Sequence, residues 1–256
     1  YFDRSRNTLT KYGADYITNG LICSEGLPYE SFYGYKAIGI FKDDDEVRNS
    51  PKQFNDNTQA GDIKYADISG PDGVPDNVVD EYDRTVIGNR FPNFEYSVSL
   101  GASWKGFDLS LLGQGVSGVD HYASGWGLRP FYQGTPISQD YIDNMWTEEH
   151  TNAKYPRLYF ADMGGTKNQR ESTYWLYDGS YFRLKNLTFG YTLPKALTQK
   201  AKIQRLRVYF SGDNLLTFTK FPQGGDPERN YNSTKGTRLV YYPQNRIISF
   251  GINLDF

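Results

Sequence analysis

Apolar and polar residues alternate along the last stretch of the chain, residues 246–256. One face carries five apolar side chains and the other carries small or polar ones: Ile248, Phe250, Ile252, Leu254 and Phe256 against Ser249, Gly251, Asn253 and Asp255. Because successive side chains of a strand point to opposite faces, this period of two predicts a strand with one apolar and one polar face. Such strands occur in soluble β-sandwiches. They are also typical of transmembrane β-barrels, in which lipid covers the apolar face and a wet lumen the polar one.

The same alternation runs through residues 94–104 and returns through 107–114. The two residues between these segments, Lys105 and Gly106, predict a tight hairpin turn, since glycine adopts a positive φ without strain. Trp104 and Phe107 flank the turn and are typical of the aromatic girdle at the edge of a membrane. Residues 94–114 are therefore predicted to form a hairpin that faces lipid on one side.

Two further strands are predicted over 181–193 and 204–218, and the connections between strands differ sharply in length. Those at 105–106 and 194–203 are short and fall at one end, whereas those at 115–180 and 219–244 are long and fall at the other. Outer-membrane barrels have short periplasmic turns and long extracellular loops. We therefore predict an all-β, antiparallel transmembrane β-barrel, with Phe256 at the periplasmic rim.

The chain divides into 1–93, a loop-rich set of strands; 94–114, the hairpin; 115–180, a long extracellular loop with a short helix over 137–149; and 181–256, the closing strands. Five clear strands are too few for a closed barrel, and an open sheet would leave backbone groups unpaired in lipid. We therefore expect residues 1–256 to be the C-terminal part of a larger barrel. The first residues lack the pattern of a signal peptide, so we expect the chain to start either after a processing site or well inside a longer polypeptide.

Composition narrows the function classes. Aromatic residues make up 16% of the chain and the net charge is −2. No apolar run approaches the roughly 20 residues that a spanning helix needs. A nearly neutral chain offers no extended surface for nucleic acid, which is not an expected partner. The single cysteine, Cys23, excludes an internal disulfide.

An acidic stretch over 67–83 is the one candidate metal site. Oxygen-bearing side chains recur at short intervals around Gly70 and Gly73, and they would be the ligands: Asp67, Ser69, Asp72, Asp76 and, in the closing position, Asp83 or Asp80. Hard carboxylate oxygens around a glycine turn are typical of a calcium loop. Pro71 lengthens the usual spacing and no glutamate closes the loop, so a plain turn is the alternative. No other cofactor is expected.

Aromatic residues in the long loop are the candidate ligand contacts: Trp126, Tyr132, Trp146, Trp175 and Tyr177. Such rings stack on sugars or pack against peptides, and exposed loops are where ligands are met. The alternative is that the rings pack the loops against one another.

No sequence pattern predicts catalysis. The G-x-G-x-x-G match at 113–118 ends a strand and opens no helix, so it lacks the context of a dinucleotide site. Glu148 and Glu149 have no evident partner carboxylate across a cleft. We expect no enzymatic activity and assign no catalytic residue.

Several stretches resemble the C-terminal third of SusC/RagA-like TonB-dependent outer-membrane transporters. In order along the chain they are 31–36 (Ser-Phe-Tyr-Gly-Tyr-Lys), 61–67 (Gly-Asp-Ile-Lys-Tyr-Ala-Asp), 83–89, 92–100, 107–115, 178–194, 206–219 and the terminal strand. The resemblance implies a 22-stranded barrel with an N-terminal plug, in the outer membrane of a Gram-negative bacterium. It also implies a SusD-like lipoprotein as a lid and TonB-driven import of glycans or oligopeptides. The plug and the TonB-contacting segment have no counterpart here. The family's Asn-Gly-Asp-Gly run is replaced by 69–73 (Ser-Gly-Pro-Asp-Gly), which weakens the calcium prediction.

Two other functions stay open at this stage: a soluble β-sandwich module that binds glycans, and a glycosidase, for which no facing carboxylate pair is evident. The importer predicts an exposed apolar belt, and the sandwich predicts a shared interior core. The residues that discriminate are Phe94, Val98, Leu100, Leu206, Val208, Phe210, Ile252 and Leu254.

Overall fold

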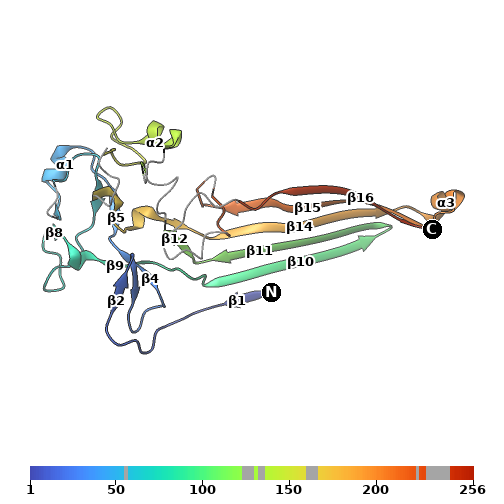
Figure 1. Cartoon of the computed structure of the whole chain (residues 1–256), viewed down its shortest axis with the longest axis horizontal. Coiled ribbons are helices and arrows are strands. Elements are labelled where there is room, and N and C mark those ends of the chain that lie inside the picture. The colour runs from blue at the N-terminus through green and yellow to red at the C-terminus, as the bar shows by residue number, and fades with distance from the viewer. Residues whose placement is uncertain (55–56, 123–129, 132–135, 160–166, 223–224, 229–242) are drawn as a thin grey trace.

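The computed structural model describes residues 1–54, 57–122, 130–131, 136–159, 167–222, 225–228 and 243–256. Long strands form one sheet, and short elements gather at one end of it (Figure 1). The sheet has six antiparallel strands in the order β1-β10-β11-β14-β15-β16. Their bounds are Phe2–Arg4, Phe94–Trp104, Phe107–Ser117, Tyr181–Thr192, Arg205–Thr219 and Ile247–Asp255. The alternating segments of the sequence are thus the long strands of the structure.

The short connections lie together at one end of this sheet, as the sequence predicts (Figure 1). Lys105 and Gly106 both have a positive φ, 47° and 90°, which is the conformation of a type I′ hairpin turn. A Cβ on Gly106 would lie 2.7 Å from the carbonyl oxygen of Thr192, so this position also needs the absence of a side chain. The other short connection contains α3 (Lys195–Thr198) and η6 (Gln199–Ala201).

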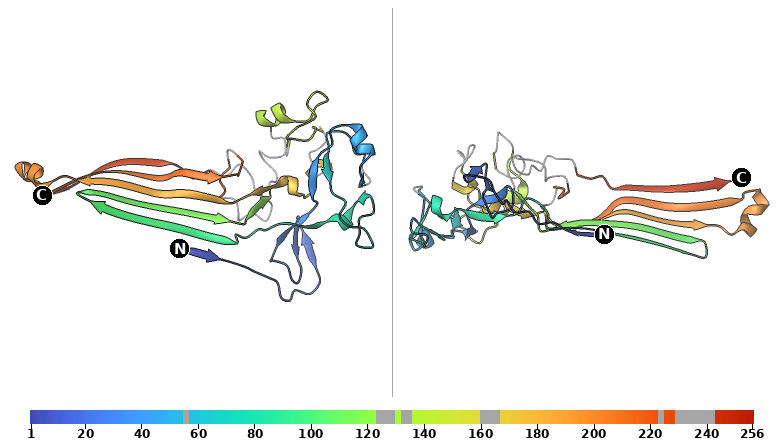
Figure 2. Two further views of the ribbon diagram at one scale, coloured as in Figure 1. Left: turned by 180° about the vertical axis from the view of Figure 1, so that it is seen from behind. Right: turned by 90° about the horizontal axis from the view of Figure 1, so that it is seen from below.

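One face of the sheet, here called the apolar face, is built from rows of residues in register across the strands. Two of these rows are Leu100, Leu111, Leu187, Gly212 and Ile248, and Ala102, Leu109, Phe189, Phe210 and Phe250. Phe250 is 81% exposed, Ile252 64% and Leu100 57%. Seen from its edge, the sheet is a single layer, and none of the described residues forms a second sheet stacked on it (Figure 2). The apolar side chains therefore do not form the interior of a β-sandwich.

The opposite face, here called the polar face, carries small and charged residues. One row consists of Gly101, Ser110, Thr188, Ser211 and Ser249. Arg207 on β15 donates two hydrogen bonds to the Asp108 carboxylate on β11, two strands away, with Nε 2.9 Å from Oδ1. The ion pair spans the intervening strand at Gly190, where a Cβ would lie 2.5 Å from the guanidinium. Polar groups on this face therefore find partners within the sheet.

The short elements at the other end form several small sheets. The largest is four-stranded, in the order β2-β3-β4-β9, and the rest are pairs. The bounds are β2 Tyr16–Thr18, β3 Leu21–Cys23, β4 Ser31–Gly34, β5 Ala37–Ile40, β6 Lys52–Gln53, β7 Ile63–Tyr65, β8 Val78–Val79, β9 Thr85–Gly88, β12 Asp120–Tyr122 and β13 Leu176–Asp178. The helices are α1 Asp44–Arg48, η1 Glu81–Asp83, α2 Gln139–Asn144, η4 Lys167–Gln169 and η5 Thr173–Trp175.

These elements share one hydrophobic core, here called the loop core: Tyr35, Ile63, Tyr65, Val79, Tyr122 and Trp175. It joins residues from the first ninety positions to residues after β11. Asp62 is 1% exposed beside it and accepts hydrogen bonds from the Tyr159 hydroxyl at 2.6 Å and from the Asn168 side chain at 3.2 Å. The predicted loops are therefore parts of one folded unit.

The helix predicted over 137–149 is shorter in the structure. Ser138 caps it by accepting a hydrogen bond from the Tyr141 amide at 3.2 Å, and it ends at Asn144. Met145 then pairs with Tyr155 in an extended bridge, and the Trp146 amide donates to the Tyr155 carbonyl at 2.8 Å. Within the residues that the structure describes, none of the helices has the length and apolar character needed to traverse a bilayer.

Candidate ligand-binding site

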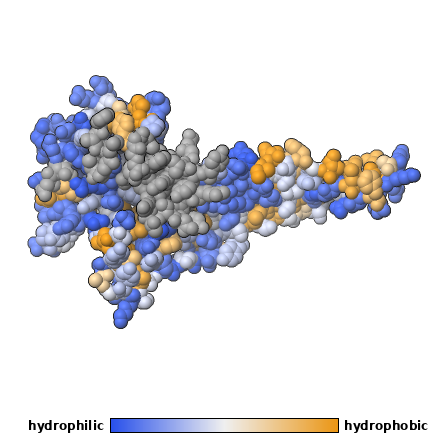
Figure 3. Space-filling model, in the orientation of Figure 1, coloured by the Kyte–Doolittle hydropathy of each residue, from blue (hydrophilic) through white to orange (hydrophobic). Residues whose placement is uncertain are grey.

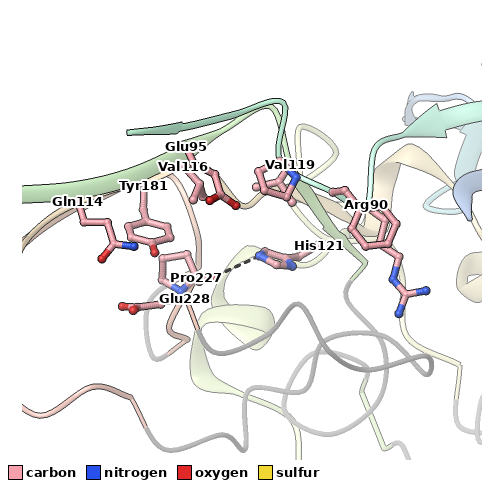
Figure 4. Close-up of a pocket in the computed structure, with 11 residues that line it drawn as sticks. Arg90, Glu95, Gln114, Val116, Val119, His121, Tyr181, Pro227 and Glu228 are labelled. Atoms are coloured by element: carbon pink, nitrogen blue, oxygen red, sulfur yellow. Dashed lines mark hydrogen bonds between the residues drawn. The ribbon is translucent and has the colours of Figure 1, made fainter. Parts of the chain in front are cut away.

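A pocket of about 380 Å³ opens on the polar face, where the long strands meet the short elements. Its walls come from β10 and β11, from the turn before β10, from β12, from the first residue of β14 and from the segment after β15 (Figure 4). The lining mixes apolar surface with charge: Phe91, Pro92, Val116, Val119, Tyr181 and Pro227, with Arg90, Glu95, Gln114, His121 and Glu228. A few polar groups on a largely apolar concave surface are typical of a binding site.

Arg183 fixes the wall of this pocket that follows β15. It is 3% exposed and donates to Asp226 at 2.8 Å, to Glu228 at 2.6 Å and to the Thr217 hydroxyl at 2.9 Å. Lys185 makes a second ion pair with Glu228. Two cations thus face two carboxylates, which is the arrangement that makes a buried charge tolerable. The segment 226–228 is held against the polar face by this network.

Asp226 also organises its own segment. Its carboxylate accepts hydrogen bonds from the amide of Glu228 at 3.0 Å and from the amide of Gln244 at 2.7 Å. Burial acts to raise the pKa of Asp226, but the hydrogen bonds from Arg183, Gln244 and Glu228 outweigh it and lower the pKa. Asp226 is therefore ionised at neutral pH.

His121 forms another wall and is 4% exposed. Its Nε2 lies 3.1 Å from the carbonyl oxygen of Pro227, and its ring meets Phe221 edge-on (Figure 4). Burial lowers the pKa of His121, although the Pro227 carbonyl and the Asp178 carboxylate act against the shift. The neutral ring with its proton on Nε2 donates to Pro227. Gly179 lies behind it, where a Cβ would be 2.3 Å from the ring.

A second cleft, of about 620 Å³, lies among the short elements and contains one of the predicted ligand contacts, Trp146. The indole Nε1 donates to the Lys42 carbonyl at 3.1 Å, and the Arg157 guanidinium lies 5.4 Å from the ring centre. The indole is half-buried, so part of its surface faces the cleft. Of the predicted aromatic residues, Trp146 lines this cleft.

The other predicted aromatic residues are placed differently. Trp175 is 2% exposed in the loop core, and its Nε1 donates to the Asn168 carbonyl at 2.7 Å. Tyr177 packs against the same core and meets Phe221 at a ring distance of 6.2 Å. Both positions favour the packing role, and ligand contact by them stays a prediction. Trp126 and Tyr132 lie outside the described residues.

The residues of the predicted calcium loop serve mainly as caps for turns. Asp83 is fully buried, and its carboxylate accepts from the amides of Ile68, Ser69 and Asp80. Asp67 accepts from the amide of Asn77, Asp76 accepts from that of Val78, and Asp72 is exposed in the turn. In the described ranges, no group of three or more acidic, histidine or cysteine side chains is arranged to hold a metal ion. Calcium binding by this loop stays a prediction.

Sequence reasoning missed the residues that build the pocket. Alternation places Glu95 on the polar strand face but does not mark it as a pocket residue. Arg183 lies in a predicted strand, and strict alternation from Leu187 would put it on the apolar face; the register shift between Leu184 and Asn186 turns it to the polar face instead. Asp226 lies in a segment rich in glycine and proline, where no local pattern marks it as the partner of an arginine 43 positions earlier.

Comparison with known proteins shows which proteins this chain resembles. No family model matches the chain. TonB-dependent receptor P3 of Formosa agariphila is 32% identical over 243 residues, which are 92% of this chain and 23% of that receptor. TonB-dependent receptor P26 of the same organism is 28% identical over 242 residues, again 92% of this chain and 23% of the receptor. The homologues are TonB-dependent receptors. The chain spans about a quarter of the length of these relatives.

Solved structures give the same result for the fold. The RagAB peptide transporter aligns with all of this chain and with 26% of its own chain, at a TM-score of 0.66 and 26% identity. The RagAB peptide importer in its "open-open" state aligns with a TM-score of 0.65. The fold is therefore mostly β, with antiparallel sheets like those of RagAB, and the described sheet is open at β1 and β16.

Proposed function

We propose that this chain forms part of the barrel wall and the extracellular loops of a TonB-dependent importer in the outer membrane of a Gram-negative bacterium. The observation that carries the proposal is the division of one sheet into an uncovered apolar face and a polar face with a pocket. An apolar surface of this extent on a soluble monomer would be an aggregation site, whereas lipid covers it in a membrane. The remaining strands of a 22-stranded barrel would come from outside this chain and close both edges of the sheet.

The lengths of the connections between strands determine the proposed orientation of the sheet in the membrane. The turn at Lys105 and the helical turn after β14 would face the periplasm, and the loop core would face outward. In space-filling view the loop end is largely hydrophilic, while apolar residues recur along the strands (Figure 3). A SusD-like lipoprotein would cover the outward end, and TonB, acting through a plug outside this chain, would supply the energy for uptake.

We propose oligopeptides as the imported ligands. The proteins with the same fold and 26% identity are described as peptide transporters and importers. The pocket supports this class, because charged groups on an apolar lining suit side chains of mixed character better than the uniform hydroxyls of a glycan.

The test uses the intact receptor that contains this chain, purified with its lipoprotein partner in detergent. Binding of a mixed oligopeptide library and of a glycan library would be measured side by side, and uptake would be followed in cells with and without TonB. Peptide binding with TonB-dependent uptake is expected. Glycan binding alone would overturn the ligand class, and uptake without TonB would overturn the transport mechanism.

A further inference from the structure

A buried tyrosine hydroxyl faces the pocket on the polar face. Tyr181 is 6% exposed and lines the pocket, and its hydroxyl points into it (Figure 4). Within the described part of the chain, this hydroxyl makes no hydrogen bond. Buried polar groups in folded proteins are almost always paired, so each exception needs an explanation. A partner for this hydroxyl can enter only through the pocket.

The neighbours of Tyr181 hold its ring in place. Val116 on β11 and Thr219 on β15 are its cross-strand partners, one on each side. The Arg183 guanidinium lies 5.7 Å from the ring centre, and Arg183 is itself fixed by the ion pairs described above. A donor that is already ordered loses little conformational entropy when a ligand binds to it.

Gln114 supplies a second neutral polar group beside this hydroxyl. It pairs with Arg183 while Val116 pairs with Tyr181, so Gln114 and Tyr181 are diagonal neighbours on one face, about 7–8 Å apart at the backbone. Its carboxamide is turned into the same space as the hydroxyl (Figure 4). Gln114 is exposed, and among the described residues its side chain has no hydrogen-bond partner. The hydroxyl can donate and the carboxamide oxygen can accept, so a donor and an acceptor lie side by side.

The charged and titratable groups of the lining are already engaged or solvated. Arg90 and Glu228 each take part in an ion pair, and the His121 ring is bonded to the Pro227 carbonyl. Glu95 is exposed, so water solvates its carboxylate. A charged ligand would have to compete with these contacts, whereas a neutral ligand with one acceptor and one donor leaves them intact.

Hydrocarbon surrounds the two free groups, from Phe91, Pro92, Val116, Val119 and Pro227. A sugar ring would bring several hydroxyl groups against this surface, and each unpaired hydroxyl would weaken binding. A residue of an extended peptide presents its N–H and its carbonyl to the same side, as residues of paired strands do. If its side chain is apolar, it carries no further polar group. The lining therefore fits such a residue better than a sugar.

We propose that Tyr181 and Gln114 form a subsite for the backbone of one apolar residue within an extended, imported oligopeptide. The Tyr181 hydroxyl donates to the carbonyl oxygen of that residue, and the Gln114 carboxamide oxygen accepts from its N–H. The apolar side chain of the ligand rests on the hydrocarbon lining. This inference rests on the proposed peptide import and adds to it the part of the ligand that the pocket binds.

The experiment uses the intact receptor that contains this chain and two small probes that differ in one group. N-acetyl-leucine dimethylamide has the N–H, the carbonyl and the side chain of leucine. The O-acetyl leucic acid analogue has an ester oxygen in place of the N–H. Affinities are measured by saturation-transfer NMR titration. The wild type is expected to bind the N–H probe about five-fold more tightly, since one hydrogen bond contributes about that factor.

Three variants assign this preference to its residues. Tyr181→Phe keeps the ring and removes the hydroxyl, so both probes should bind about five-fold more weakly with their ratio unchanged. Gln114→Met removes the carboxamide at similar size, so the two probes should bind equally. Tyr209→Phe makes the same change on the polar face near the short turns and should alter neither affinity. The ratio of the probes is read within one variant, so a loss of folded receptor would not mimic its change.

The outcomes separate this subsite from peptide import itself. Equal affinity of the two probes in the wild type, or binding of neither, would overturn the subsite and leave peptide import standing if the peptide library binds. Wild-type affinities in Tyr181→Phe would overturn it as well. If the library fails to bind while the N–H probe binds with the expected dependence on Tyr181 and Gln114, peptide import fails and the subsite stands.

Discussion

Placing a charge in the middle of the apolar face provides the most direct test of the membrane assignment. β10 has 11 residues from Phe94 to Trp104, which span about 34 Å at the usual rise per residue. At the tilt of about 40° usual in outer-membrane barrels, this length covers about 25 Å of bilayer, the height of a typical apolar band. The row with Leu100 and Leu111 then lies about 10 Å above the Trp104 row, close to the midplane.

Leu111→Arg puts a guanidinium at this depth, and Ser110→Arg puts the same group one residue earlier on the polar face. An arginine on the lipid face near the midplane costs about 2–4 kcal/mol, whereas lumen positions tolerate charge. We expect Leu111→Arg to lower the free energy of unfolding by that amount. We expect Ser110→Arg to change it by less than about 1 kcal/mol, because the exposed side chain reaches water.

The assay is urea unfolding of the intact receptor in phospholipid vesicles, together with its abundance in isolated outer membranes. Both arginine variants share charge, size and strand, so their difference reports the environment of the two faces. An equal loss in the two variants, or a larger loss for Ser110→Arg, would refute the assignment of the apolar face to lipid.

Three further predictions concern the site and the loop core. Arg183→Met leaves Asp226 buried without its cation and should lower the free energy of unfolding by about 3–5 kcal/mol. The double variant Arg183→Met, Asp226→Leu should recover much of this lost stability, measured by thermal unfolding of the intact receptor. Because the pKa of His121 is lowered in the folded state, its contribution to stability is present above the unfolded pKa of about 6.5 and lost as the pH falls through the lowered value. His121→Gln should therefore flatten the pH dependence of the melting temperature below pH 6.5, and an unchanged slope would contradict this. Trp175→Phe removes a buried hydrogen bond to Asn168 and part of the loop core, so we expect it to lower the free energy of unfolding by about 1–3 kcal/mol. Limited proteolysis should then cut the loops faster in this variant, and Trp146→Phe, at a half-buried position, serves as the control.

The long strands could be predicted from sequence because alternation is a local property. The polarity of each residue from Phe94 to Trp104 indicates which face of the sheet its side chain lies on. The Lys105–Gly106 turn then fixes the pairing with β11. The asymmetry between short and long connections was equally visible. The irregularities of β14 and β15 were not predicted, since the bulge near Lys185 depends on which residues its neighbours offer for pairing.

The loop core could not be predicted, because its contacts join residues far apart in the chain. The Ile63 amide donates to the Asn168 side chain 105 positions later, and the Tyr65 hydroxyl donates to the carbonyl of Lys167. Neither segment has a hydrophobic periodicity from which its partner could be predicted. The tryptophan positions were visible in the sequence, but whether a ring lines a cleft, as Trp146 does, or a core, as Trp175 does, depends on these distant contacts.

Aromatic clusters at both ends of the apolar face bring the strand pattern and the membrane assignment together. Near the loop end, Tyr96 of β10, Phe182 of β14 and Phe218 of β15 stack at ring distances of 6.2 and 6.5 Å, with β11 between the first two. Near the short turns, Phe107 lies 4.4 Å from Tyr191 and in register with Trp104. Tyr96 and Trp104 are eight positions apart on β10, which is about 20 Å across a bilayer at the usual tilt. The rows at Val98 and Leu100 between them are aliphatic, and the next row, with Phe189, Phe210 and Phe250, adjoins the aromatic residues at the short turns. Rings at two heights with aliphatic side chains between them match the two interfaces and the hydrocarbon core of a membrane. A face that docked on another protein would have no reason to divide its aromatic residues in this way.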